Sequence, residues 1–126
     1  MSKEIINTSN APAPIGPYNQ AVKAGGFLFI SGQIAIVPGT SEIKNGNITE
    51  ETEQVMKNLQ TILEEAGLGF SNIVKTTIFL KEMSFFTAVN EEYGKYFDAD
   101  FPARETVAVK GLPKDVNVEI SMIAYE

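Results

Sequence analysis

Cysteine, histidine and tryptophan are absent from this sequence, and arginine occurs only once. Without cysteine the chain has no disulfide, no thiolate nucleophile and no cysteine-ligated zinc site. Without histidine it lacks the commonest general base and the commonest metal ligand. Any catalysis would therefore depend on carboxylates, hydroxyls, lysine, the single arginine, backbone groups or water. A metal site could be built only from oxygen ligands.

Positive charge is also scarce, because 10 Lys and Arg stand against 16 Asp and Glu, which gives a net charge of −6. Binding to a phosphate backbone or an anionic membrane surface needs clustered Lys and Arg, so we expect neither nucleic acid nor membrane as a partner. No apolar run is long enough to span a bilayer, and residues 1–4 show no apolar segment of a signal peptide. These features indicate a soluble, cytoplasmic protein.

The length of the chain suits a single domain, which we place at residues 1–126. Three prolines within residues 10–17 predict a loop or an extended arm there. The clearest helix spans residues 50–66, where apolar residues recur at helical spacing, with Thr49 as its N-cap and Gly67 just past its end.

The whole chain is predicted to run as three strands, a helix, a strand, a helix and two strands. This order favours an α+β fold, with a mostly antiparallel sheet and two helices packed on one of its faces. In the last predicted strand, the residues that point to each of the two faces include apolar ones. This indicates that the sheet face away from the helices takes part in self-association. The predicted strands include residues 19–24, 27–31, 73–80, 104–110 and 116–125, and the second helix spans residues 84–97 with Ser84 as its N-cap.

Two charged residues are candidates for chemistry. Arg104 is the only guanidinium beside nine lysines, and a guanidinium can hold a carboxylate or phosphate through two parallel hydrogen bonds. A structural ion pair is the alternative. Glu119 lies in an apolar strand, where desolvation would raise its pKa toward the range of general acid–base catalysis. Simple alternation would instead turn Glu119 to water, and the pattern alone favours that alternative.

Polar residues and glycine mark further candidate positions. Asn90 falls on the apolar stripe of the second helix, where its amide would hold a ligand or tie the helix to a loop. Tyr18 follows the turn pair Gly16-Pro17 and either enters a cleft or packs on the core. Of these two alternatives, the sequence favours packing on the core. Ser31-Gly32 ends a buried strand, where glycine permits close approach of a ligand or marks a bulge or the strand end.

Five segments, in order and over nearly the whole chain, resemble the RidA/YjgF family of reactive-intermediate imine deaminases. No segment is decisive alone, but the five together are specific. They are IGPYNQA at residues 15–21, FISGQI at 29–34, VKTTIFL at 74–80, PAR at 102–104, and LPKD at 112–115 leading to VEI at 118–120.

The resemblance implies a chorismate-mutase-like α+β fold and a homotrimer with clefts between its subunits. It implies hydrolysis of 2-imino acids, formed from enamines such as 2-aminoacrylate and 2-aminocrotonate, to 2-oxo acids and ammonia. These intermediates escape from pyridoxal-phosphate-dependent dehydratases. The family uses no cofactor and no metal, so we expect none here.

The resemblance also implies a role for each matching residue. Arg104 would clamp the substrate carboxylate, and Glu119 would hold or activate the attacking water. The cleft would further contain Tyr18 and Ser31, the bordering Asn90, and ligand-contacting backbone groups of Gly32 and Thr106.

Two positions depart from the family pattern. Thr106 stands where many members carry cysteine, which leaves backbone contacts possible but excludes a thiol-dependent role. Glu105 stands where members usually have a small residue. Strand alternation should turn Glu105 away from the face of Arg104, whereas an ion pair between them would occupy the carboxylate site.

Two other functions are alternatives to the deaminase. A non-catalytic module that binds 2-oxo acids or similar small carboxylates and regulates a partner would keep Arg104 but would not need Glu119. A ribonuclease or translation inhibitor, activities attached to relatives in the family, is disfavoured by the net charge of −6 and the lack of a basic stripe.

Overall fold

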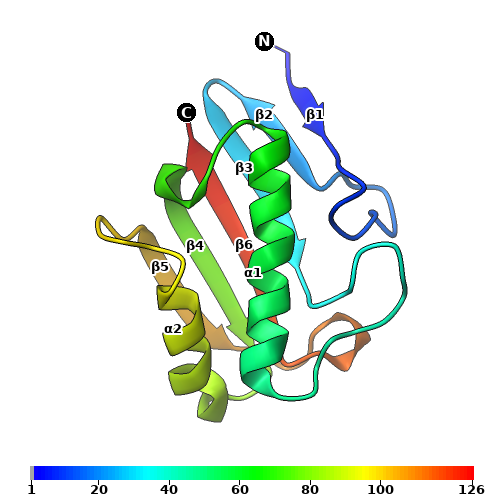
Figure 1. Cartoon of the computed structure of the whole chain (residues 1–126), viewed down its shortest axis with the longest axis vertical. Helices are drawn as coiled ribbons and strands as arrows, with labels where there is room; N and C mark the ends of the chain where they lie inside the picture. Colours follow the sequence, from blue (N-terminus) through cyan, green and yellow to red (C-terminus); the bar gives the residue numbers. More distant parts are fainter. Residues whose placement is uncertain (1) are drawn as a thin grey trace.

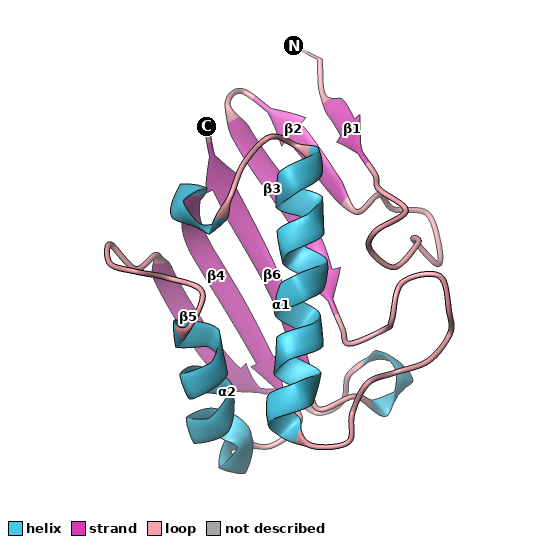
Figure 2. Cartoon of the chain, viewed as in Figure 1, coloured by secondary structure: helices cyan, strands magenta, loops and turns pink. Residues whose placement is uncertain are grey.

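Two helices lie side by side over one face of a six-stranded sheet in the computed structural model, which describes residues 2–126 (Figures 1 and 2). The elements are β1 (Glu4–Ile6), β2 (Ala21–Ala24), β3 (Phe27–Gln33), α1 (Ile48–Glu65), β4 (Ile73–Leu80), α2 (Phe86–Gly94), β5 (Ala103–Ala108) and β6 (Val118–Tyr125). The strand order is β1-β2-β3-β6-β4-β5, and only the pair of β4 and β5 is parallel. The predicted α+β fold and the predicted succession of elements are confirmed.

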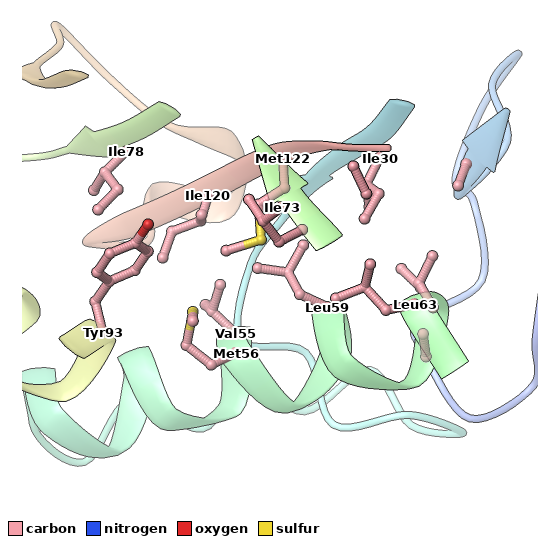
Figure 3. Close-up of a cluster of buried hydrophobic side chains, with 14 of the residues drawn as sticks. Ile30, Val55, Met56, Leu59, Leu63, Ile73, Ile78, Tyr93, Ile120 and Met122 are labelled. Carbon is pink, nitrogen blue, oxygen red and sulfur yellow. The ribbon is translucent and has the colours of Figure 1, made fainter. Parts of the chain in front are cut away.

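The core lies between the helices and the sheet face that they cover (Figure 3). Helix α1 contributes Val55, Leu59 and Leu63 from the predicted stripe, and these meet side chains such as Ile120 and Met122 of β6. Burial of each large apolar side chain stabilises the fold by about 1.5–3 kcal/mol, so this layer holds α1 on the sheet. Neither α1 nor α2, within residues 2–126, combines the length and the apolar character that crossing a membrane requires.

Helix α1 begins earlier than predicted, and Thr49 is not its N-cap. The N-cap is Asn47, whose side-chain oxygen accepts a hydrogen bond of 2.8 Å from the backbone N–H of Glu50. Asparagine is the stronger capping residue of the two, which explains why it wins over threonine. At the other end Gly67 has a φ of 76°, so it ends the helix in the left-handed region as predicted.

We expect Asn47→Ala to lower the free energy of unfolding by about 1 kcal/mol, because the amide of Glu50 would lose its partner. Urea denaturation followed by circular dichroism measures this change. Thr49→Ala is the matched control and should stay within about 0.5 kcal/mol of the wild type. Equal losses in the two variants would contradict the assignment of the cap.

Helix α2 is shorter than the predicted 84–97. Ser84 lies inside a 3₁₀ turn, Met83–Phe85, and is therefore not the N-cap of the helix, which begins at Phe86. After Gly94 the backbone tightens into turns in which the N–H groups bond to carbonyls three residues back, and Phe97 still packs against the core. Core packing at helical spacing therefore extends beyond the helix itself, which is why the pattern overestimated its length.

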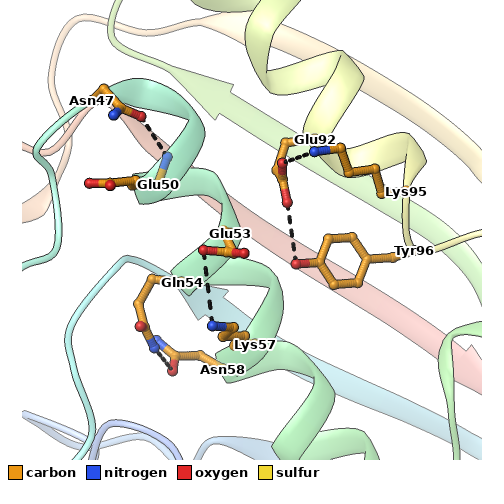
Figure 4. A network of polar contacts seen from close by, with 9 residues as sticks. All are labelled: Asn47, Glu50, Glu53, Gln54, Lys57, Asn58, Glu92, Lys95 and Tyr96. Carbon is orange, nitrogen blue, oxygen red and sulfur yellow. Dashed lines mark hydrogen bonds and ion pairs between the residues drawn. The ribbon is translucent and has the colours of Figure 1, made fainter.

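A buried carboxylate fastens the end of α2. Glu92 accepts hydrogen bonds from Lys95 Nζ at 2.9 Å and from the Tyr96 hydroxyl at 3.4 Å (Figure 4). Burial and the nearby charge of Glu92 raise the pKa of Tyr96 to about 12, so the phenol stays protonated and keeps donating. The network ties α2 to the segment that leads into β5.

The last two strands are also shorter than predicted, since β5 ends at Ala108 and β6 begins at Val118. Between them lies a 3₁₀ turn, Pro113–Asp115, in which Lys114 and Asp115 both have a φ of 55°. Two successive left-handed residues are incompatible with a strand, and both lie in the turn between the two predicted strands.

Candidate functional site

The strand register places the two charged candidates on opposite faces of the sheet. Arg104 in β5 is paired with Thr76 in β4, which is fully buried beneath the helices. Glu119 in β6 is paired with Phe79 in β4. Side chains alternate along a strand, so Thr76 and Phe79 point to opposite sides. Within one chain, Arg104 therefore belongs to the helix-covered side and Glu119 to the open side.

Arg104 lies in a recess of about 330 Å³ between α2 and the edge of the sheet. Its guanidinium carbon Cζ lies 5.1 Å from the centre of the Tyr93 ring and 5.8 Å from that of Phe86. No carboxylate of residues 2–126 lies within ion-pair distance of it. The N–H groups of Arg104 therefore remain free to bind a carboxylate or phosphate. The other lining residues are Asn90, Tyr93, Gly94, Phe101 and Pro102.

Asn90 of α2, which lines this recess, and Thr106 of β5 are the other two candidates on this side of the sheet. Asn90 is exposed and lies outside the buried stripe formed by Val89 and Tyr93, which corrects its predicted place on the helix. The hydroxyl of Thr106 is buried and has no hydrogen-bond partner in the part of the chain that the structure describes. Thr106 follows Arg104 by two residues, so its side chain points to the same face of β5.

The backbone of β5 offers further binding groups. In the sheet, β5 is an edge strand whose one neighbour is β4. The N–H of Val109 donates to the carbonyl of Leu80 at 2.9 Å, which fixes the side of the strand that bonds to β4. Because backbone groups alternate along a strand, those of Arg104 and Thr106 point to the free edge. A ligand at the guanidinium would meet these groups.

Glu119 borders a separate cavity of about 570 Å³. The side chain is half-buried, and burial raises the pKa of its carboxyl. Alternation placed Glu119 on the open face correctly, although its carboxyl borders a cavity there and is not fully exposed. A carboxyl with a raised pKa at a cavity suits proton transfer. The walls come from residues 12–20, residues 31–36, and the turn that contains Pro113 and Lys114.

Gly32 makes room for the carboxyl of Glu119. A Cβ atom built on Gly32 would lie 2.9 Å from the Glu119 Cδ and 3.1 Å from its Cγ. Carbon atoms do not approach so closely, so any side chain at position 32 would displace the carboxyl. Of the explanations for this glycine, the structure supports the bulge, because the register of β3 against β6 shifts between Ile30 and Gln33.

Tyr18 and Ser31 line the cavity of Glu119, as the sequence-based hypothesis requires. The Tyr18 ring is 48% exposed, and its hydroxyl oxygen accepts a hydrogen bond of 3.2 Å from the N–H of Ile15. Packing in the core, which the sequence favoured for Tyr18, is wrong. The Ser31 hydroxyl donates to the Asn19 carbonyl at 2.7 Å, so this serine fastens the arm to β3 while its oxygen can still accept a bond.

Sequence analysis missed Gln20, which shapes the same cavity. Its buried amide nitrogen donates to the carbonyls of Thr8 and Pro12 at 3.0 and 2.8 Å, and its oxygen accepts from the Thr8 N–H at 2.6 Å. These bonds fix the arm that carries the cavity wall. A single glutamine ahead of an apolar strand gave no pattern that could have revealed this role.

Glu105 does not compete for the guanidinium. It lies on the opposite face from Arg104 and pairs with Lys75 of β4 at 3.5 Å. The predicted orientation of Glu105 is therefore confirmed, and it forms no ion pair with Arg104.

The fold is a mostly antiparallel sheet covered by two helices, with a recess at Arg104 on one side and a cavity at Glu119 on the other. A model of the family described as endoribonuclease L-PSP matches residues 8–126. A RutC family protein of Pyrococcus horikoshii is 53% identical over 98% of each chain. Reactive Intermediate Deaminase A, a chloroplastic protein of Arabidopsis thaliana, is 44% identical over 98% of this chain and 66% of its own length.

Solved structures agree with these sequence relatives. RidA from an Antarctic Psychrobacter species is 39% identical, with a TM-score of 0.93 over 98% of this chain and 99% of the other. E. coli TdcF with bound serine is 40% identical, with a TM-score of 0.93 over 98% of each chain. The chain belongs to the RidA/YjgF family, whose sequence model bears the L-PSP description.

Proposed function

We propose that this protein hydrolyses 2-imino acids to 2-oxo acids and ammonia, acting on 2-iminopropanoate and 2-iminobutanoate and on the enamines that form them. The observation that carries the proposal is the guanidinium of Arg104, which lies in a recess with no carboxylate partner among residues 2–126. The relative named Reactive Intermediate Deaminase A supports this chemistry. TdcF with bound serine supports a small 2-substituted carboxylic acid as the ligand class.

In the proposed reaction Arg104 binds the substrate carboxylate through two parallel hydrogen bonds. A water held by Glu119 adds its oxygen to the imine carbon, and its proton passes through the carboxyl to the nitrogen. The hydroxyl proton of the resulting carbinolamine passes to the amino nitrogen in the same way, and the carbon–nitrogen bond breaks, which releases ammonia and leaves the 2-oxo acid. Imines also hydrolyse without a catalyst, so positioning and acid–base catalysis worth about 10²–10⁴-fold would be sufficient.

A complete site would need two copies of the chain. Arg104 and Glu119 lie on opposite faces of one sheet, so a small substrate cannot reach both within a single chain. The open face also carries apolar side chains that water disfavours, among them Phe29, which is 47% exposed, and Tyr125, which is 50% exposed. We therefore propose a homotrimer in which the recess of one subunit meets the cavity of the next.

A trapping experiment tests the activity. A pyridoxal-phosphate-dependent dehydratase, the class of enzyme that we propose as the source of the substrate, generates 2-iminobutanoate in the presence of semicarbazide. We expect this protein to lower the amount of semicarbazone in proportion to its concentration, because hydrolysis competes with trapping. An unchanged amount at a large excess of protein over the dehydratase would contradict the proposal.

The bound serine of TdcF also favours a second candidate, a non-catalytic sensor of small carboxylates. Such a protein would bind 2-oxobutanoate through Arg104 and leave the semicarbazone unchanged. Calorimetric titration beside the trapping assay separates the two functions. Cleavage of RNA, which the family description mentions, is disfavoured by the net charge of −6.

The role of Glu119 predicts a pH dependence. Burial raises its pKa above the ordinary value of 4.5, so the carboxylate form is lost at a higher pH than in a free peptide. If the carboxylate activates water, kcat/KM should fall as the pH drops through this raised pKa. Glu119→Gln should lower kcat by about 10²–10⁴-fold and abolish this acid limb. An unchanged profile in the variant would exclude Glu119 from the reaction.

Glu119→Gln should lower activity but raise stability. The folded state binds the Glu119 proton more tightly than the unfolded chain, so ionised Glu119 destabilises the fold above the raised pKa. Glu119→Gln should therefore raise the melting temperature at neutral pH. The gain should shrink as the pH falls toward 4.5, where both states become protonated. Thermal melts across this range check the sign.

A further inference from the structure

We infer that Tyr93 is a positioning residue for Arg104: its ring, anchored through Thr76, supports the guanidinium so that the N–H groups stay directed at the substrate carboxylate. The inference deepens the function proposed above and rests on it for the identity of the ligand. In the sequence, Tyr93 has only the spacing of an apolar core residue on the second helix.

Three elements meet at this tyrosine. Tyr93 projects from α2 into the core and is 3% exposed (Figure 3). Its hydroxyl donates a hydrogen bond of 2.8 Å to Oγ1 of Thr76 on β4. Thr76 is the register partner of Arg104 on β5, so both side chains leave the sheet next to each other on the same face. The Tyr93 side chain therefore contacts both Thr76, which lies beside Arg104 in the sheet, and the guanidinium of Arg104.

The ring has little freedom to move. Phe97 packs against it with ring centres 4.9 Å apart, and the hydroxyl bond fixes its far end. Burial raises the pKa of Tyr93, so the hydroxyl stays protonated and remains a donor to Thr76. Because the ring is fixed, it restricts the movement of the guanidinium that packs against it.

An aromatic support suits a residue that must bind a carboxylate. A cation is attracted to the face of a ring, and the contact of 5.1 Å between Arg104 Cζ and the Tyr93 ring centre lies within the range of this attraction. An acidic partner would hold the guanidinium too, but it would occupy the N–H groups that the ligand needs. Glu92, which precedes Tyr93 on α2, is instead bonded to Lys95 and Tyr96. The Phe86 ring, at 5.8 Å, adds a second support.

The test uses the binding of 2-oxobutanoate, followed by calorimetric titration of the full chain. Tyr93→Phe keeps the ring and loses the hydroxyl, whereas Tyr93→Leu loses both. We expect Tyr93→Leu to raise Kd by about 3- to 30-fold, as the loss of a cation–π contact predicts, and Tyr93→Phe to raise it less. Tyr96→Phe, which removes a hydroxyl bonded to Glu92, is the matched control and should bind like the wild type.

Chemical rescue separates positioning from a merely structural effect. In Arg104→Ala, added guanidinium chloride at millimolar concentration should restore part of the 2-oxobutanoate binding, because the Tyr93 ring can bind the free cation. Arg104→Ala with Tyr93→Phe should be rescued similarly, and Arg104→Ala with Tyr93→Leu should not. If Tyr93→Leu fails to fold, Tyr93→Met replaces it in both experiments. Wild-type binding in the variant without the ring, or equal rescue with and without the ring, would overturn the inference.

These outcomes are independent of turnover. A protein that binds 2-oxobutanoate through Arg104 but hydrolyses no imine would refute the proposed deaminase and still report on Tyr93. A protein that hydrolyses imines and tolerates loss of the Tyr93 ring would refute the positioning role alone.

Discussion

Arg104→Ala should leave the protein folded and lower kcat/KM for 2-iminobutanoate by about 10²–10³-fold, because removing one partner of a desolvated charge pair costs about 2–5 kcal/mol. The fold should tolerate the change, since the guanidinium makes no ion pair within residues 2–126. Steady-state kinetics with enzymatically generated imine, together with a thermal melt, measure both effects. The same variant should lose its affinity for 2-oxobutanoate.

Arg104→Lys is the sharper variant, since it keeps the charge and removes the planar pair of donors. We expect it to recover little of the lost activity and to remain at least about tenfold below the wild type, because a hydrogen bond between charged groups contributes about 1.5–3 kcal/mol. Lys44→Ala removes a positive charge from an exposed loop and should change kcat/KM little. Activity near the wild-type value in Arg104→Lys would refute bidentate binding of the substrate.

The layered fold was predictable because its signals are local. Alternation in β6 identifies Val118, Ile120 and Met122 as the covered set, and all three are buried. The spacing of apolar residues likewise identifies the covered side of α1. The strand order depends on contacts between distant segments, such as β6 between β3 and β4, and periodicity does not encode these. Helix ends were predicted less well, because neighbouring polar residues such as Asn47 and Thr49 can each act as a cap.

The candidate site was predictable only as a set of residues. Counting arginines singles out Arg104, and the family motifs add Glu119 and Gly32. The close contact between Gly32 and Glu119 joins strands β3 and β6, so it follows from a non-local register that no single segment reveals. Tyr93 has the spacing of an ordinary core residue, and only the structure places its ring against the guanidinium.

The separation of Arg104 from Glu119 predicts that two inactive variants will restore each other. If each site takes its guanidinium from one subunit and its carboxyl from a neighbour, a mixed oligomer of Arg104→Ala and Glu119→Gln contains some sites with both groups intact. Random assembly of equal amounts places an intact pair at about one quarter of the sites. Mixing under denaturing conditions and refolding should therefore yield about a quarter of the wild-type activity.

Each variant refolded alone is the control and should stay near its own low activity. A second mixture combines wild type with the double variant Arg104→Ala/Glu119→Gln. About one quarter of the sites in this mixture should also be intact, because each intact site needs two neighbouring wild-type subunits. A site contained within one chain predicts a different pair of results. The mixed single variants would stay inactive, and the mixture of double variant and wild type would keep about half of the activity. The activities of the two mixtures together therefore distinguish a site shared between subunits from a site within one chain. Both activities are normalised to wild type refolded alongside, which corrects for incomplete refolding.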